Sequence, residues 1–139
     1  MKFLLDTNVI SEPTKPRPNK GVMAWLAAVN EDSVFLSVVT ITELHYGIDG
    51  VTAGKHRRRL DEWLGGEWTA RFQGRILPID VDVADACGRL VARSQSHGRA
   101  IEPRDAFIAA TVEVHGLTLV TRKAPDFEAL VNDTLTPWN

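Results

Sequence analysis

Short apolar segments with the length of β-strands alternate along this sequence with longer segments of helical periodicity. The expected strands are residues 3–5, 34–39, 76–79, 117–120 and 134–136. The expected helices are residues 21–29, 40–48, 55–68, 83–97 and 103–114. Strands that alternate with helices are joined by crossover connections, which make neighbouring strands parallel. The order of elements therefore predicts an α/β fold built on a mainly parallel sheet.

Length and composition fit one intracellular domain. The chain has 139 residues, of which 44% are hydrophobic and 24% charged, so we expect one domain with its own core over residues 1–139. A single cysteine, Cys87, excludes an internal disulfide bond and a cysteine-based zinc site. No segment has the length and hydrophobicity of a signal peptide or a membrane span. These features predict a soluble, cytoplasmic protein without membrane contacts.

The charge balance limits how the chain could bind nucleic acid. Its net charge of −2 gives no overall attraction to RNA or DNA. Such a partner would need local basic surface or bound cations. The densest positive run is residues 55–59, which is commonly just a solvated helix face and is also the best candidate surface for phosphate groups.

Polar side chains follow the expected strands at their carboxyl ends. Asp6 follows the first strand, Glu43 lies one helical turn past the second, and Thr121 follows the fourth. Asp105 opens the helix that precedes the fourth strand. Ligands bind outside the carboxyl ends of the strands in parallel sheets, so these groups should share one edge.

Three of these groups are carboxylates, and their convergence predicts a metal site. Asp6, Glu43 and Asp105 would repel one another when brought together. A hard divalent cation such as Mg²⁺ or Mn²⁺ is the simplest group that would hold them in one place. The leading hypothesis from the residues is therefore a metal-dependent phosphodiesterase.

Each acid also has a purely structural interpretation. Asp6 could cap a helix or form a turn, and Asp105 could simply favour the first turn of its helix. Glu43 could bind the backbone amide of Thr40 in a capping box, and for Glu43 taken alone we favour that interpretation.

Five stretches of the sequence together resemble a known family. They include a Thr-x-x-Glu-Leu turn and an Asp-x-x-Ile-Ala-Ala-Thr helix, and they are residues 4–13, 36–44, 74–78, 105–111 and 119–122. On these motifs the chain resembles PIN-domain ribonucleases of the VapC/FitB toxin type, over essentially its whole length. The resemblance implies a three-layer α/β/α sandwich around a mainly parallel sheet of four to five strands.

The resemblance also implies a function and partners. The implied function is that of the toxin of a type II toxin–antitoxin system. Such a toxin is a Mg²⁺- or Mn²⁺-dependent endoribonuclease that hydrolyses RNA phosphodiester bonds. In-line attack would leave a 5′-phosphate and a 3′-hydroxyl. A cognate antitoxin with a DNA-binding module would inhibit the enzyme. The chain would form a homodimer, and a heterotetramer or larger assembly with the antitoxin.

The same resemblance assigns roles to individual residues. Asp6, Glu43 and Asp105 match the acidic residues of the family, which are its catalytic and metal-binding groups. Thr7 and Asn8 match the supporting polar positions beside the first acid. We expect them to orient carboxylates and waters.

One position departs from the family pattern. The family usually has Asn or Asp after the Thr121-Arg122 pair, where this chain has Lys123. Asp126 follows closely and is the expected source of the remaining catalytic carboxylate. Lys123 would either displace one metal ion or contact substrate phosphate beside Arg122, so one or two ions are possible. Thr121 should orient a carboxylate.

Two other classes of function stay open. One is a PIN-fold module, weakly active or inactive as a nuclease, that binds an antitoxin and modulates operator DNA binding; Lys123 favours it. The other is a phosphoaspartate fold. A haloacid-dehalogenase-like phosphatase needs an acid where this chain has Asn8, and a receiver domain needs adjacent acids where Thr7 stands. Both phosphoaspartate folds fit poorly.

Overall fold

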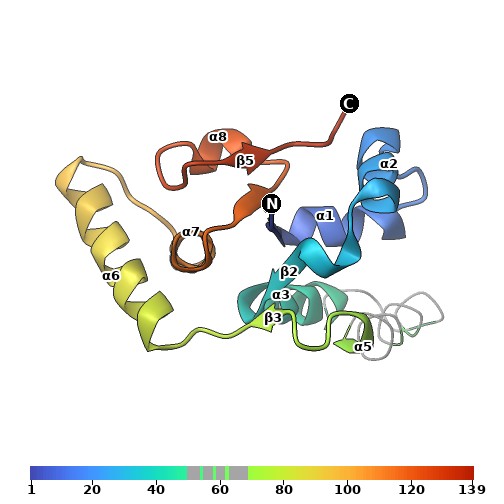
Figure 1. The fold of residues 1–139 in the computed structure, drawn as a ribbon, viewed down its shortest axis with the longest axis horizontal. Helices are drawn as coiled ribbons and strands as arrows, with labels where there is room; N and C mark the ends of the chain where they lie inside the picture. Colours follow the sequence, from blue (N-terminus) through green and yellow to red (C-terminus); the bar gives the residue numbers. More distant parts are fainter. Residues whose placement is uncertain (50–53, 55–57, 59–61, 63–68) are drawn as a thin grey trace.

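A five-stranded sheet forms the centre of the structure, a computed structural model that describes residues 1–49, 54, 58, 62 and 69–139 (Figure 1). The strands are β1 (Phe3–Leu5), β2 (Val34–Ser37), β3 (Ile76–Leu77), β4 (Thr118–Val120) and β5 (Thr134–Leu135). Their order is β3-β2-β1-β4-β5, and all four pairings between them are parallel. The predicted parallel α/β fold is confirmed.

Helices connect the strands and flank the sheet. The α-helices are α1 (Thr7–Ser11), α2 (Lys20–Ala28), α3 (Val38–Asp49), α5 (Thr69–Arg71), α6 (Val81–Ser96), α7 (Pro103–His115) and α8 (Ala124–Phe127). Two 3₁₀ turns, η1 (Glu12–Thr14) and η2 (Glu31–Ser33), complete the described elements. Figure 1 shows α6 and α7 on one side of the sheet and α1 and α2 on the other. The helix expected at 55–68 and its basic run fall almost entirely outside the described residues.

Alternate side chains of β1 enter two separate apolar layers. Leu4 is buried in a cluster with Ile108 of α7 and Phe127 of α8. Leu5 is buried in another cluster with Val9 of α1 and residues of α2. Successive strand residues point to opposite faces, so even a three-residue strand serves both layers. Each such leucine contributes about 1.5–3 kcal/mol by burial, which ties β1 firmly between the helical layers.

The contact between α6 and α7 forms a third apolar cluster. Cys87 and Leu90 of α6 pack there with Ala106 and Ala110 of α7. Burial raises the pKa of the Cys87 thiol, which therefore stays protonated. Cys87 is therefore a buried packing residue.

The beginning of α7 is fixed by Pro103. Pro103 is the first helical residue, where its missing amide hydrogen costs nothing, and Glu102 is the N-cap. The helix ends at His115 and is followed by its C-cap Gly116, whose φ of 62° lies in the left-handed region. Asp105 is consequently held in the first turn of a well-defined helix, at the same end as the carboxyl edge of β1.

The second strand is shorter than expected, because a helix begins inside the predicted segment. β2 ends at Ser37, and the Ser37 hydroxyl oxygen accepts a hydrogen bond from the amide of Val39 at 3.0 Å. This serine caps α3, so Val38 and Val39 are helical in spite of their β-branched side chains. The predicted capping box of Thr40 and Glu43 is wrong. Thr40 lies inside the helix, and its buried hydroxyl has no hydrogen-bond partner among the described residues.

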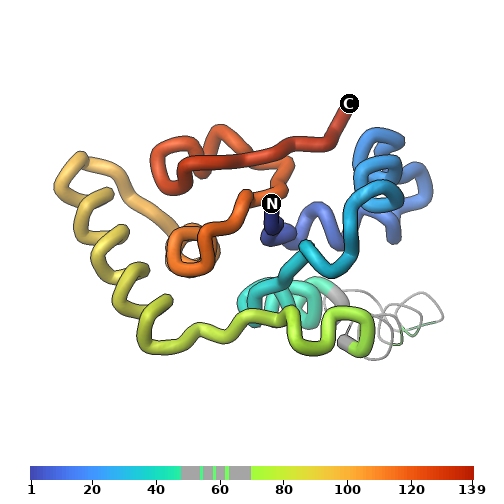
Figure 2. Tube along the Cα trace, in the orientation of Figure 1, coloured from blue at the N-terminus to red at the C-terminus, as the bar shows by residue number. Residues whose placement is uncertain are grey.

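The last residues of the chain run across to α2, as Figure 2 shows. The backbone oxygen of Asn139 accepts a hydrogen bond from the Asn19 side chain at 3.1 Å, and the indole of Trp138 donates to Glu12 at 3.3 Å. Burial raises the pKa of Glu12, but hydrogen bonds from Lys15 and Trp138 outweigh burial and hold this pKa below its ordinary value. The C-terminal segment therefore helps to bury an ionised carboxylate.

No helix in the described part of the chain has the length and apolar character that crossing a membrane requires.

Candidate active site

Asp6 lies at the carboxyl end of β1, and every oxygen of its side chain is occupied. The residue is 0% exposed. Its Oδ1 accepts a hydrogen bond from the amide of Thr7 at 2.8 Å, and its Oδ2 accepts one from the hydroxyl of Thr121 at 2.7 Å. The amide of the Asn8 side chain approaches Oδ2 at 3.4 Å. Asp6 is also the N-cap of α1, so its structural and its proposed chemical roles coexist.

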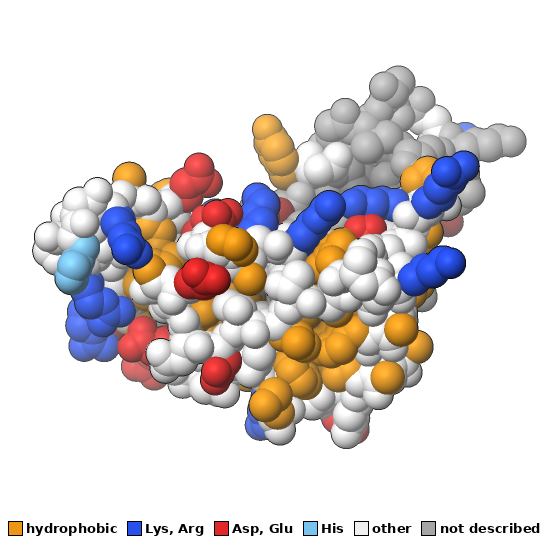
Figure 3. All heavy atoms as spheres, turned by 90° about the horizontal axis from the view of Figure 1, so that it is seen from above, with side chains coloured by type: hydrophobic (Ala, Val, Ile, Leu, Met, Phe, Trp, Pro, Cys, Tyr) orange, Lys and Arg blue, Asp and Glu red, His pale blue; other side chains and the backbone are white. Residues whose placement is uncertain are grey.

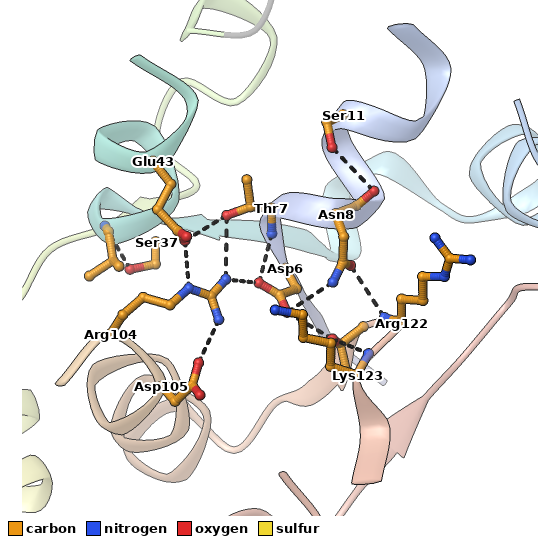
Figure 4. Close-up of polar contacts among 12 residues, drawn as sticks. Asp6, Thr7, Asn8, Ser11, Ser37, Glu43, Arg104, Asp105, Arg122 and Lys123 are labelled. Atoms are coloured by element: carbon orange, nitrogen blue, oxygen red, sulfur yellow. Dashed lines mark hydrogen bonds and ion pairs between the residues drawn. The ribbon is translucent and has the colours of Figure 1, made fainter. Parts of the chain in front are cut away.

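Glu43 and Asp105 reach the same place from two different helices. Glu43 extends from α3, and its Oε1 accepts a hydrogen bond from the hydroxyl of Thr7 at 2.7 Å. Asp105 extends from the first turn of α7. Figure 4 shows both carboxylates directed toward the guanidinium of Arg104, which also contacts Asp6. The convergence of these three acids, which their sequence positions predicted, is present in the structure.

The group at the centre of the three acids is the guanidinium of Arg104 (Figure 4). Its Nε donates to Oε1 of Glu43 at 2.7 Å, and its Nη1 donates to Oδ1 of Asp105 at 2.8 Å. Its Nη2 forms a close contact with Oδ1 of Asp6. Burial alone lowers the pKa of Arg104, but the charge of Asp6 and the hydrogen bonds to all three acids raise it above its ordinary value.

Sequence reasoning did not identify Arg104, although a signal was present. A cation in the first turn of a helix opposes the helix dipole, so it needs a nearby anion to be stable there. Arg104 is the second residue of α7, directly before Asp105. An arginine at this position, next to an expected metal ligand, is itself an indication of an ion-pair network.

Backbone amides tie the loop after β4 to the same site. The amide of Arg122 donates to the side-chain oxygen of Asn8 at 3.2 Å, and the amide of Lys123 donates to the hydroxyl of Thr121 at 3.0 Å. These contacts orient Asn8 and Thr121, which in turn donate to Asp6. The guanidinium of Arg122 lies over the ring of Trp138, 5.8 Å from its centroid, and Figure 4 shows it directed away from the acids.

Asp126 is close to the site without joining its network. It is exposed in the first turn of α8 and lines a pocket of about 300 Å³ together with Asp105. Within the described residues the hydrogen bonds around Arg104 do not include Asp126. The role of Asp126 as an additional carboxylate stays a prediction, and its structural support is the pocket that Asp126 shares with Asp105.

The donor set suits a hard divalent cation, while the space between the donors is taken. Three carboxylates carry three negative charges and Arg104 carries one positive charge, which leaves a net charge of −2 at the site. Carboxylate oxygens are the ligands that Mg²⁺ and Mn²⁺ prefer. Among the described residues, however, no group of three or more acidic, histidine or cysteine side chains is arranged to hold a metal ion. The acids are spaced around a guanidinium.

Lys and Arg side chains form a band across the face of the molecule shown in Figure 3. Exposed basic side chains are the main source of affinity for a nucleic-acid backbone. The overall charge of −2 therefore conceals a surface on which positive charge is locally concentrated.

Comparison with known proteins identifies the family. The PIN domain family matches residues 3–129. The Toxin FitB of Neisseria gonorrhoeae is 40% identical over 137 residues, which cover 99% of each chain. The VapC ribonuclease Y4jK of Sinorhizobium fredii is 38% identical over 136 residues, which cover 98% of this chain and 97% of the relative.

A solved structure shows the same fold. The structure of FitAB bound to the IR36 DNA fragment contains a chain that superposes on this one with a TM-score of 0.92 and 38% identity, over 99% of this chain and 96% of that one. The sequence motifs, the parallel sheet and these relatives agree, and the predicted family is confirmed. The chain belongs to the PIN-domain family and, within it, to the ribonuclease toxins of the VapC/FitB type from toxin–antitoxin systems.

Proposed function

We propose that the chain hydrolyses RNA phosphodiester bonds as a Mg²⁺- or Mn²⁺-dependent endoribonuclease at the site of Asp6, Glu43 and Asp105. The observation that carries the proposal is the convergence of these three carboxylates, from three separate elements, on a single point. Carboxylates repel one another, so such a cluster is built to hold positive charge. The relatives of the chain include a VapC ribonuclease, which supports RNA as the substrate.

The three acids would be the protein ligands of the cation, and Asp126 would contribute directly or through a water. A divalent cation bound there supplies positive charge that polarises the scissile phosphate and lowers the pKa of a water. The protein has to keep the carboxylates ionised and correctly aimed. In-line attack by water on phosphorus then leaves a 5′-phosphate and a 3′-hydroxyl.

Neighbouring residues would position these acids and the substrate. The hydroxyl of Thr7 fixes one oxygen of Glu43, and Thr121 with Asn8 fixes the second oxygen of Asp6. Arg122 and Lys123 are exposed beside the site, where they would contact the phosphates of the bound RNA. Most of the free energy of RNA binding would come from such phosphate contacts.

The experiment that tests the proposal is RNA cleavage by the purified chain with Mg²⁺, with Mn²⁺ and with a chelator. We expect cleavage only with metal, and mapping should show 5′-phosphate ends. Asp6→Asn, Glu43→Gln and Asp105→Asn should each lower the rate by about 100-fold or more, since each removes charge that holds the cation. Asp85→Asn, which removes an exposed acid paired with Arg89 on α6, is the matched control and should not change the rate. Cleavage by Asp6→Asn at the unmodified rate would disprove the mechanism.

We also propose a protein partner, a cognate antitoxin that covers this site and carries a DNA-binding module. The support is the solved FitAB assembly on DNA, whose FitB-like chain has the fold of this one. Co-purification with the product of a neighbouring reading frame, followed by a gel-shift assay on the DNA upstream, tests this proposal. The complex should bind that DNA and should not cleave RNA. An RNase-active complex would contradict it.

A second candidate function is binding without significant catalysis. Two positively charged side chains favour binding without catalysis. Arg104 occupies the acidic centre, and Lys123 stands where the family pattern has an oxygen ligand. Expression of the chain alone separates the two functions. Growth arrest that Asp105→Ala relieves supports the nuclease, and arrest that persists in this variant supports the binding module.

A further inference from the structure

Arg104 satisfies the three acids of the site simultaneously. Each nitrogen of its guanidinium serves a different carboxylate: Nε contacts Glu43 at 2.7 Å, Nη1 contacts Asp105 at 2.8 Å, and Nη2 contacts Asp6. The oxygens that accept these bonds are those that face the centre of the cluster (Figure 4). A divalent cation held between the same three acids would need the space that the guanidinium fills. The guanidinium and a metal ion therefore exclude each other.

The position of Arg104 depends on its contacts with the acids. The side chain is 23% exposed, and it extends from the second residue of α7, in a helical turn that disfavours a positive charge. Its described hydrogen bonds are to the three carboxylates and, more weakly at 3.4 Å, to the Thr7 hydroxyl. Once the carboxylates are engaged elsewhere, nothing in this set holds the guanidinium at the centre. A long side chain at the solvent boundary can then leave the site without unfolding the helix.

We propose that Arg104 is an internal counter-ion that competes with the divalent cation for the acids. This inference rests on the proposed metal-dependent function of the same site. In the metal-free protein Arg104 holds three acids together, one of them fully buried, and reduces the repulsion between them. Metal binding then has to displace the guanidinium, which weakens the affinity of the site for metal. Filling the site therefore needs a higher concentration of divalent cation than it would without Arg104.

The experiment measures Mn²⁺ binding to the full chain without RNA, by isothermal titration calorimetry and by the electron paramagnetic resonance signal of free Mn²⁺. Arg104→Met removes the charge and keeps much of the side-chain volume. Its Kd for Mn²⁺ should fall by about tenfold or more, because a positive charge in contact with the ligands is gone. Arg104→Lys keeps the charge and should stay within about threefold of the unmodified protein. Arg89→Met makes the same change of charge at an exposed ion pair on α6 and should leave the Kd unchanged.

Thermal unfolding is a second measurement, and it also shows whether the Arg104→Met variant is folded. Without metal, Arg104→Met should have a lower Tm than the unmodified protein, since its acids are no longer compensated. On addition of Mn²⁺ its Tm should rise further than that of the unmodified protein, because tighter binding to the folded state stabilises it more.

The outcomes separate this inference from the proposed function. An Arg104→Met variant that binds Mn²⁺ no more tightly than the unmodified protein overturns the role of Arg104, and metal-dependent RNA cleavage would still stand. If neither protein binds Mn²⁺, both the role of Arg104 and the metal site are wrong. Tighter Mn²⁺ binding by Arg104→Met without any RNA cleavage would support the role of Arg104 and reject the nuclease.

Discussion

The hydroxyl of Thr121 donates a hydrogen bond of 2.7 Å to Oδ2 of Asp6. This hydrogen bond joins two residues that are 115 positions apart in the sequence. Thr121 follows β4 and Asp6 follows β1, and these two strands pair in parallel with Leu5 beside Val120. The strand register therefore places the donor next to the acid. Both residues are fully buried, so the bond forms where water cannot replace it.

Thr121→Val should destabilise the protein by about 1–3 kcal/mol, because the variant leaves a buried carboxylate oxygen without its best donor. The measurement is urea unfolding at neutral pH. RNA cleavage should also fall, since Asp6 loses its fixed orientation. A Thr121→Val variant with unchanged free energy of unfolding would show that the bond is not needed.

Thr40→Val is the matched control, because it is the same substitution at another fully buried threonine. The Thr40 hydroxyl has no hydrogen-bond partner among the described residues. Removing it should leave the free energy of unfolding unchanged or raise it by about 1 kcal/mol. A loss as large as that of Thr121→Val would mean that burial, and not hydrogen bonding, decides the cost.

Gly21→Ala should destabilise the packing of α2 against the C-terminal segment by about 1–3 kcal/mol. A Cβ atom at Gly21 would overlap the carbonyl oxygen of Pro137 and crowd Asn139. Gly88→Ala is the comparison, because nothing lies within 4 Å of a Cβ at that position in α6. It should stabilise the helix by about 0.5–1 kcal/mol. Differential scanning calorimetry of both variants checks the opposite signs.

Glu12 should contribute stability that depends on pH. Its folded pKa lies below the ordinary value of 4.5, since hydrogen bonds from Lys15 and Trp138 outweigh burial. The contribution is therefore present above pH 4.5 and is lost as the pH falls through the folded pKa. Unfolding free energies of the unmodified protein and of Glu12→Gln should differ most at neutral pH and approach each other in acid. A difference that stays constant over this range would contradict the assignment.

Asp126→Asn should lower RNA cleavage less than Asp6→Asn does. Asp126 shares a pocket with Asp105 but is exposed and lies outside the Arg104 network, so its charge acts on the cation at longer range. We expect a loss of about tenfold, against about 100-fold or more at Asp6, in a cleavage assay at fixed Mg²⁺. Equal losses would place Asp126 among the direct ligands.

The fold was predictable where local signals and tertiary structure agree. The helix expected at residues 103–114 is α7, and the strand expected at residues 76–79 contains β3, which lies at an edge of the sheet. The positions of Asp6, Glu43 and Asp105 relative to their strands were enough to bring them to one edge. These predictions needed only the geometry of a parallel sheet.

The errors came from interactions that a sequence pattern does not contain. Val38 and Val39 favour a strand by themselves, yet the Ser37 hydroxyl starts a helix there. Taken alone, Glu43 favoured a cap of its own helix, although its partners are Thr7 and Arg104 from distant elements.

The placement of Thr121 and Arg104 late in the sequence has a consequence for synthesis. A nascent chain that has left the ribosome as far as α3 already carries Asp6 and Glu43, but β1 has no β4 beside it. The buried acid then lacks both its hydroxyl donor and its positive partner, and the cluster cannot assemble. The three acids can therefore meet in one place only after α7 and β4 have been synthesised and have packed beside β1.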